Sequence, residues 1–137
     1  MLKLTKKIEY ALISLVYISD QEEEKLSSAK EIAEANFIPG EILAKILQNL
    51  ASLSMIKSVK GPKGGYKLCT DIDKISIIEF IEMLEGPIGL TDCSTLVDCD
   101  QECHCTIKNP IIQINNKVIA ALKDITLSQF TRSGIKK

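Results

Sequence analysis

The residues able to do chemistry are concentrated in one short segment of this chain. Four of the five cysteines and the single histidine fall within residues 93–105. Cys93, Cys99 and Cys105 are each separated by five residues. Thiolates spaced along a loop can wrap a polynuclear iron–sulfur core, whereas a single zinc ion more often uses paired Cys-x-x-Cys knuckles, which this segment lacks. The spacing therefore favours an iron–sulfur cluster, either 2Fe-2S or 4Fe-4S.

The same segment leaves other chemistry open. Cys103 and His104 lie inside it and are further candidate ligands. A zinc-stabilised interaction module could take four ligands from this set, and a cluster-free redox regulator could use the thiols directly. Idle or disulfide-bonded thiols and a small electron carrier complete the alternatives. Colour separates the metals, because an iron–sulfur protein absorbs visible light and a zinc protein does not.

Size and charge limit what the rest of the chain can be. With 137 residues, 45% of them hydrophobic, the chain fits one domain or one small domain with an oligomerising appendage. The net charge of −1 gives no global basic field. However, no acidic residue lies between Glu41 and Asp71, where there are five lysines: Lys45, Lys57, Lys60, Lys63 and Lys67. This local charge suits a polyanion.

The first residues do not have the pattern of an export signal. Glu9 interrupts the start of the apolar run and no small-residue cleavage site follows. No apolar stretch is long enough to cross a bilayer. We therefore expect a cytoplasmic protein with no membrane association. In the reducing cytosol, an odd number of cysteines indicates ligands or redox thiols rather than a disulfide framework.

Three helices are predicted in the N-terminal half. Apolar residues recur at helical spacing from about Thr5 to Ser19, with Thr5 as a cap. Ser28 and Glu31 have capping-box spacing, which starts a helix that runs to about Ala35. After a break, Pro39 suits the first turn of a helix that continues to about Leu53. A short helix, a tight turn and a longer helix outline a helix-turn-helix.

The longer helix has two distinct faces. Its expected buried side is Ile42, Leu43, Ile46, Leu47, Leu50 and Leu53. Its polar stripe is Glu41, Lys45, Gln48 and Ser52. Such a stripe can hydrogen-bond base edges and phosphates in a major groove. Any helical hairpin leaves a polar face outward, so this pattern alone is weak.

A predicted β-hairpin strengthens the DNA-binding interpretation. Residues 55–59 and 66–69 alternate like two strands around a glycine-rich basic tip. Lys60 and Lys63 would neutralise phosphates, while Gly64 and Gly65 would let the backbone approach a surface closely. We interpret the hairpin as a wing beside the recognition helix. Cys69, at the end of the second strand, is expected to be a small buried residue.

The C-terminal half is expected to hold the cysteine segment and a dimerisation helix. A helix over Ser76–Glu85 ends at Gly86 and Pro87, and a second helix runs from Asn109 to about Ser128. The second helix carries a near-heptad apolar stripe that implies a homodimer: Ile111, Ile114, Val118, Leu122 and Ile125. The fold is thus mainly α, with a winged helix-turn-helix over 1–75. Residues 76–137 would supply the cluster loop, about 86–108, and the dimerisation helix, about 109–128.

These features together resemble one family, the winged-helix transcription regulators that include IscR and NsrR. The resemblance covers nearly the whole chain and is most specific in the wing sequence taken with the cysteine spacing. It is carried by Leu4-Thr5-Lys6, Tyr10-Ala11, residues 59–66, residues 84–88, the three cysteines and Ile125-Thr126-Leu127. The resemblance implies a homodimer that binds pseudo-palindromic operators and senses nitric oxide, redox state or iron–sulfur supply through its cluster. It implies no enzymatic activity, and no recognisable catalytic set surrounds His104.

Two departures limit what the resemblance carries over. Lys108 stands where IscR-like members have a histidine ligand, and Ala44 stands where IscR has a glutamate on the recognition helix. Neither the cluster type nor the operator sequence can therefore be transferred. NsrR-like members place a carboxylate near this point of the first helix, so Glu9 of the partner subunit is the expected fourth ligand. Cys103 and then His104 are the alternatives.

Overall fold

A computed structural model describes residues 4–22, 25–86 and 106–131 of the chain. The chain divides into two compact units. The N-terminal unit comprises Leu4–Asp71 together with the segment from Ser128 onward, and the C-terminal unit comprises Ile72–Leu127. Within the described ranges, no helix is both long enough and apolar enough to span a membrane.

The first two helices of the N-terminal unit begin at the predicted caps. Helix α1, Lys6–Ser19, is capped by Thr5, whose hydroxyl accepts from the N–H of Ile8 at 3.3 Å. Helix α2, Ala29–Asn36, is capped by Ser28, whose hydroxyl accepts from the N–H of Glu31 at 3.1 Å. Each cap satisfies a backbone donor that the helix leaves unpaired. The two predicted helices are confirmed.

Helix α3, Gly40–Ser52, completes the helix-turn-helix and packs on both α1 and α2. Pro39 is the residue before the helix, one position earlier than predicted. The prediction that Ile42 is buried is wrong, because 47% of it is exposed. Each residue turns the helix by about 100°, so a face centred on Leu43 and Leu47 leaves Ile42 at its edge. The buried face consists of Leu43, Ile46, Leu47 and Leu50.

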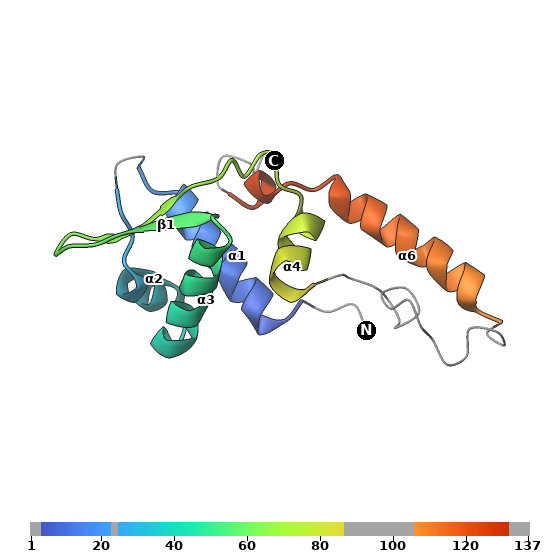
Figure 1. Cartoon of the computed structure of the whole chain (residues 1–137), viewed down its shortest axis with the longest axis horizontal. Coiled ribbons are helices and arrows are strands. Elements are labelled where there is room, and N and C mark those ends of the chain that lie inside the picture. Colours follow the sequence, from blue (N-terminus) through green and yellow to red (C-terminus); the bar gives the residue numbers. More distant parts are fainter. Residues whose placement is uncertain (1–3, 23–24, 87–105, 132–137) are drawn as a thin grey trace. The chain divides into compact units, whose positions relative to one another are not determined.

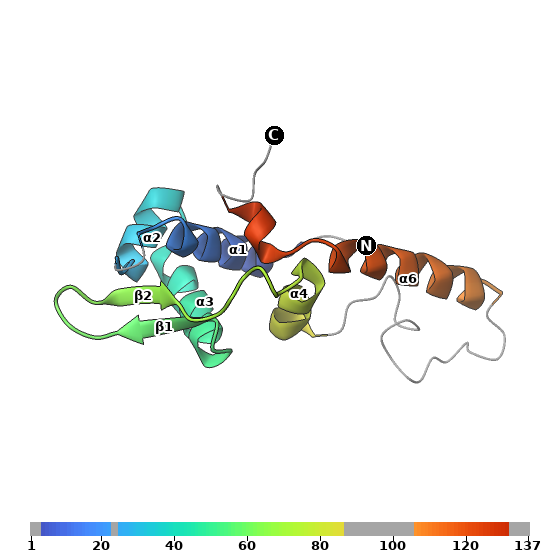
Figure 2. The ribbon, with the colours of Figure 1, turned by 90° about the horizontal axis from the view of Figure 1, so that it is seen from above.

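The hairpin pairs β1, Ile56–Val59, with β2, Gly65–Leu68, in antiparallel register. It extends beyond α2 and α3 of its own unit (Figures 1 and 2). Ser27 forms an isolated antiparallel bridge with Tyr66 of β2: the N–H of Tyr66 donates to the Ser27 carbonyl at 2.7 Å, and the N–H of Ser27 donates to the Tyr66 carbonyl at 3.1 Å. The prediction that Cys69 is buried is wrong. Its backbone N–H pairs with Met55, but its thiol is free and exposed at the sheet edge.

The C-terminal unit is built on helix α4, Ile77–Glu85. Its capping box is complete: the Ser76 hydroxyl accepts from the N–H of Glu79 at 3.2 Å, and the Glu79 carboxylate accepts from the N–H of Ser76 at 3.0 Å. Helix α6, Lys108–Lys123, packs against α4. The core of this unit is formed by Ile77, Ile78, Phe80, Ile81, Leu84 and Leu127.

The last long helix ends earlier than the predicted Ser128. Helix α6 ends at Lys123, because the next residues pair with the chain ahead of α4. The N–H of Ile77 donates to the Ile125 carbonyl at 2.8 Å, and the N–H of Leu127 donates to the Ile75 carbonyl at 2.9 Å. This short antiparallel bridge uses backbone groups that a continued helix would need. A 3-10 turn, η1 Leu127–Phe130, follows it.

The contact between Gly65 and Ser27 predicts a strong effect of adding one methyl group. A Cβ on Gly65 would lie 2.7 Å from the Ser27 backbone, which cannot move without breaking the hydrogen bonds between Ser27 and Tyr66. We expect Gly65→Ala to lower the free energy of unfolding by about 1–3 kcal/mol in urea denaturation followed by circular dichroism. Gly40→Ala is the matched control, because nothing lies within 4 Å of its added Cβ. Equal stabilities of the two variants would contradict this packing.

Candidate nucleic-acid interface

The four predicted polar residues of α3 share one solvent-facing stripe. Glu41, Lys45, Gln48 and Ser52 are all at least partly exposed, on the side of the helix opposite its buried leucines. The Ser52 hydroxyl donates to the Asn49 carbonyl at 2.6 Å, so its proton is used within the helix. The stripe therefore presents an acceptor, a cation and an amide, which are the groups that contact base edges and phosphates. Their roles on DNA remain predictions.

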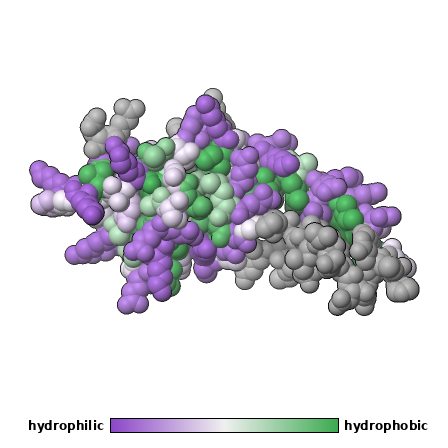
Figure 3. Space-filling model, viewed as in Figure 1, coloured by the Kyte–Doolittle hydropathy of each residue, from purple (hydrophilic) through white to green (hydrophobic). Residues whose placement is uncertain are grey.

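The hairpin carries the lysines of the acid-free stretch into solvent. Lys57, Lys60, Lys63 and Lys67 are all exposed along the strands and at the tip. Hydrophilic side chains cover this end of the N-terminal unit in the surface view (Figure 3). Exposed ammonium groups interact with phosphates without needing to bury either charge, so the hairpin can bind a polyanion as it stands.

Gly64 and Gly65, near the hairpin tip, lie where a side chain would collide with neighbouring backbone atoms. A Cβ on Gly64 would collide with the carbonyl oxygen of Val59, and the N–H of Gly64 closes the turn by donating to the Gly61 carbonyl at 2.9 Å. Gly65 is required by its contact with Ser27. The sequence interpretation assigned both glycines to close approach of DNA. The packing explains them without DNA, and a DNA contact at Gly64 or Gly65 stays a prediction.

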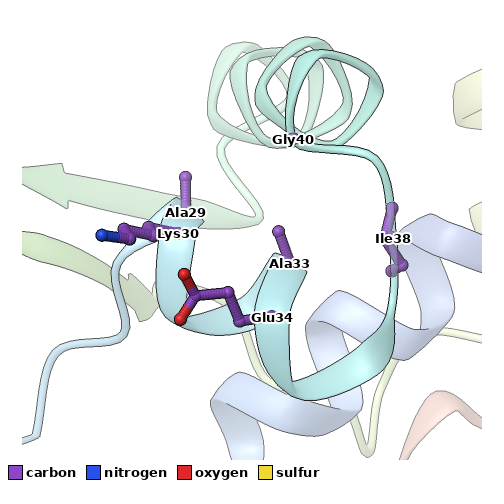
Figure 4. Close-up of a pocket in the computed structure, with 6 residues that line it drawn as sticks. All are labelled: Ala29, Lys30, Ala33, Glu34, Ile38 and Gly40. Atoms are coloured by element: carbon purple, nitrogen blue, oxygen red, sulfur yellow. The ribbon is translucent and has the colours of Figure 1, made fainter.

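A shallow pocket lies where α2 turns into α3 (Figure 4). It is lined by Ala29, Lys30, Ala33, Glu34, Ile38 and Gly40. Nothing lies within 4 Å of a Cβ added to Gly40, so the hollow is open at this residue. Lys30 stands on α2 on the side away from Ile38 (Figure 4). The pocket is therefore a hollow of the helix-turn-helix itself, with one lysine and one glutamate on its rim.

The cysteine segment, residues 93–105, is not among the residues that the structure describes. Cys93, Cys99, Cys103, His104 and Cys105 lie outside the described residues, so their predicted ligand roles stay predictions. Among the residues that are described, no three histidine, cysteine or acidic side chains come together as a metal site. The segment starts after α4 and ends before α6, and these two helices pack together within the C-terminal unit.

Glu9, the other predicted ligand, lies in the first turn of α1 directly after the buried Ile8. Its Oε2 accepts from Lys6 Nζ at 2.9 Å, and 40% of its side chain is exposed. This hydrogen bond and the carboxylate charge raise the pKa of Lys6. An ion pair this open to water is readily broken. The Glu9 carboxylate is thus accessible to a cation or metal that binds it more strongly than Lys6 does. No such group is present among the residues that the structure describes.

The predicted dimerisation stripe is incompletely covered. Ile111, Val118, Leu122 and Ile125 are half-buried, and 49% of Ile114 is exposed. Apolar side chains are visible at the surface along α6 (Figure 3). Sequence reasoning missed Asn115, which is only 6% exposed. Its spacing of four from Ile111 and three from Val118 places it on the apolar face, and that spacing was the available signal.

Comparison with known proteins agrees with this architecture. The sequence model of the Rrf2 family, described as an iron-dependent transcriptional regulator, matches residues 4–133. The transcriptional regulator NsrR of Shouchella clausii is 30% identical over 121 residues, covering 88% of this chain and 78% of the relative. IscR of Vibrio atlanticus is 24% identical over 133 residues, covering 97% of this chain and 77% of the relative.

Among solved structures, the chain is similar to CymR, the global cysteine regulator of B. subtilis. The TM-score is 0.78 at 28% sequence identity, and the alignment covers 97% of this chain and 98% of that chain. The T. potens IscR structure gives a TM-score of 0.72 at 21% identity over 99% of this chain and 93% of that chain, a likeness in fold. The winged helix-turn-helix predicted from the sequence is confirmed.

The exposed lysines and the α3 stripe predict two separable effects on DNA binding. Lys60→Ala should weaken binding to all duplexes and reduce the salt dependence, by about 0.9 in the slope of log K against log salt for each phosphate that is no longer neutralised. Gln48→Ala should instead change base preference. Lys117→Ala is the control, since it removes an exposed lysine from α6. Unchanged affinity of Lys60→Ala for operator and random DNA at physiological salt would contradict the wing assignment.

Proposed function

Because the chain belongs to the Rrf2 family of transcription regulators, we propose that it is a homodimeric repressor or activator controlled by an iron–sulfur cluster. The observation that carries this proposal is a pairing of two features. An exposed polar stripe on α3 and a basic hairpin occur in one unit, and a segment with four cysteines and a histidine follows in the other. The first feature suits operator DNA, and the second suits a sensor.

On DNA, α3 would lie in the major groove and the hairpin would contact phosphates or the minor groove. Lys45 and Gln48 would face base edges, while Lys60 and Lys63 would fix the position of the protein without reading sequence. A symmetric dimer presents two such units, so its operator should be a near-palindrome. The site of action would be the cytoplasm.

The donor set fits an iron–sulfur cluster. Cys93, Cys99 and Cys105 would hold it, with Glu9 of the partner subunit as the fourth ligand and Cys103 or His104 as alternatives. When bound, the cluster would supply iron that reacts with nitric oxide or oxygen. Glu9 is suited to a ligand that can leave, because carboxylate oxygen binds iron less strongly than thiolate.

The position of Glu9 supports a link between sensing and DNA binding. Its neighbour Ile8 is only 1% exposed, and α1 packs directly against α3. A displacement of Glu9 would therefore move α1, the helix against which the proposed recognition helix α3 packs. The chain itself would transmit the signal through this contact, because close-packed side chains pass on small displacements.

A second candidate is a cluster-free thiol regulator. It is favoured by the similarity to CymR, whose structure is named as that of a cysteine regulator. In that case two of the same thiols would be oxidised to a disulfide, or one would attack a small-molecule disulfide and form a mixed disulfide with release of a small thiol. The DNA-binding surfaces would keep their roles. The purified protein would be colourless, as it would be if the segment bound zinc.

Ligand substitutions test the cluster assignment. Serine in place of Cys93, Cys99 or Cys105 should abolish the visible absorption of anaerobically purified protein. Glu9→Ala should keep a bound cluster with a changed spectrum and altered reactivity toward nitric oxide, and Cys103→Ser should change little. Cys69→Ser is the matched control, because that free thiol lies in the N-terminal unit. Loss of the cluster in Cys103→Ser, with wild-type behaviour of Glu9→Ala, would make Cys103 the fourth ligand.

Charges on the apolar stripe of α6 test the dimer. Val118→Asp combined with Leu122→Asp would place two carboxylates where a partner helix must pack, and burying them unpaired is strongly unfavourable. We expect monomers in sedimentation, with the helical circular dichroism signal retained. Asn116→Asp, on the exposed side of α6, should leave the dimer intact. An intact dimer in the double variant would show that α6 is not the interface.

A further inference from the structure

Phe37, in the turn between α2 and α3, combines two unfavourable properties. It is 94% exposed, the highest exposure among the large apolar residues that the structure describes. Its φ of 56° and ψ of 40° place it in the left-handed region, which glycine and asparagine adopt far more readily than phenylalanine. The exposed ring therefore adds little packing to the free protein, and the left-handed backbone adds strain.

The backbone conformation at this position is needed, but the phenyl ring is not. The N–H groups of Phe37 and Ile38 both point to the Ala33 carbonyl, with the second at 3.0 Å, and they end α2. The left-handed residue then turns the chain so that Ile38 is buried at 5% exposure. Glycine would do this with less strain. The ring itself must therefore be explained by something outside the free chain.

The location of Phe37 indicates what it contacts. It lies three residues before Gly40, the first residue of α3. Because consecutive Cα atoms are 3.80 Å apart, it is within about 11 Å of the end of α3 that a helix-turn-helix inserts into the major groove. Ile42, in the first turn of α3, is 47% exposed. Two apolar side chains thus accompany the polar stripe at the end of the helix nearest to base edges.

A protein partner fits these two side chains less well than DNA does. A stable protein interface buries about 800 Å² on each side, whereas one aromatic side chain buries about 150–250 Å². A thymine methyl group in the major groove needs only one apolar side chain. We propose that Phe37, together with Ile42, contacts thymine methyl groups of the operator and so helps determine its sequence. This inference rests on the proposed function.

The test removes only the methyl group. Full-length, anaerobically purified protein would select duplexes from a random library, and each thymine of the selected site would be replaced in turn by deoxyuridine. At one or two positions per half-site, the wild type should bind about fourfold more weakly per methyl group removed, the equivalent of about 0.8 kcal/mol for one buried CH₂-sized group. Phe37→Asn should bind more weakly and should show no such decrease at the position that Phe37 contacts.

Asparagine is chosen because it tolerates the left-handed conformation, so a melting temperature at or above that of the wild type is expected. Phe130→Asn removes another partly exposed phenyl ring of the same unit and should keep the wild-type ratio of thymine to uracil affinities. If Phe37→Asn keeps that ratio, or binds every duplex as the wild type does, the contact is wrong and a protein partner becomes the explanation. If the wild type selects no duplex at all, the proposed function fails together with this contact.

Discussion

The packing of α1 against α3 is the contact that positions the proposed DNA-binding surface. Leu43, Leu47 and Leu50 of α3 are completely buried, and Ile8 and Leu15 on the buried face of α1 are at most 3% exposed. Each fully buried aliphatic side chain contributes about 1.5–3 kcal/mol, while an exposed ion pair contributes about 0–1 kcal/mol. Apolar burial therefore orients α3, and the charges on its outer face are left to interact with something else. The same packing would connect Glu9 to the recognition helix.

The helices were predictable because their signals are local. Apolar spacing, and the predicted caps at Thr5 and Ser28, depend on residues within one or two turns, and each of these two hydroxyls accepts a backbone N–H as expected. The predicted end of the last long helix was wrong because contacts with a segment distant in the sequence determine where that helix ends. Residues 125–127 leave the helix because they pair with residues 75–77, and no pattern within 109–128 contains that information.

The exposure of residues at the edges of helices and strands also could not be predicted from the sequence. Periodicity gives the direction of an apolar face but not its width, so Ile42 was assigned to a face that ends before it. Cys69 follows a strand of alternating residues, yet the sheet has only two strands in the described part of the chain, and nothing described there covers its thiol. In contrast, the interpretation of residues 93–105 depends on the cysteine spacing together with the family resemblance. Glu9 of the partner subunit as the fourth ligand stays a prediction that comes from the resemblance to NsrR-like members.

The proposed regulator requires that a cluster in one part of the chain controls DNA affinity in another. One anaerobic preparation, divided into a coloured portion and a portion stripped of iron by a chelator, should be titrated against the same selected duplex at the same salt concentration. Allosteric coupling in proteins commonly corresponds to about 5–150-fold in affinity. We therefore expect the affinities of the two portions to differ by at least about fivefold. Identical affinities of coloured and colourless protein would contradict control by the cluster.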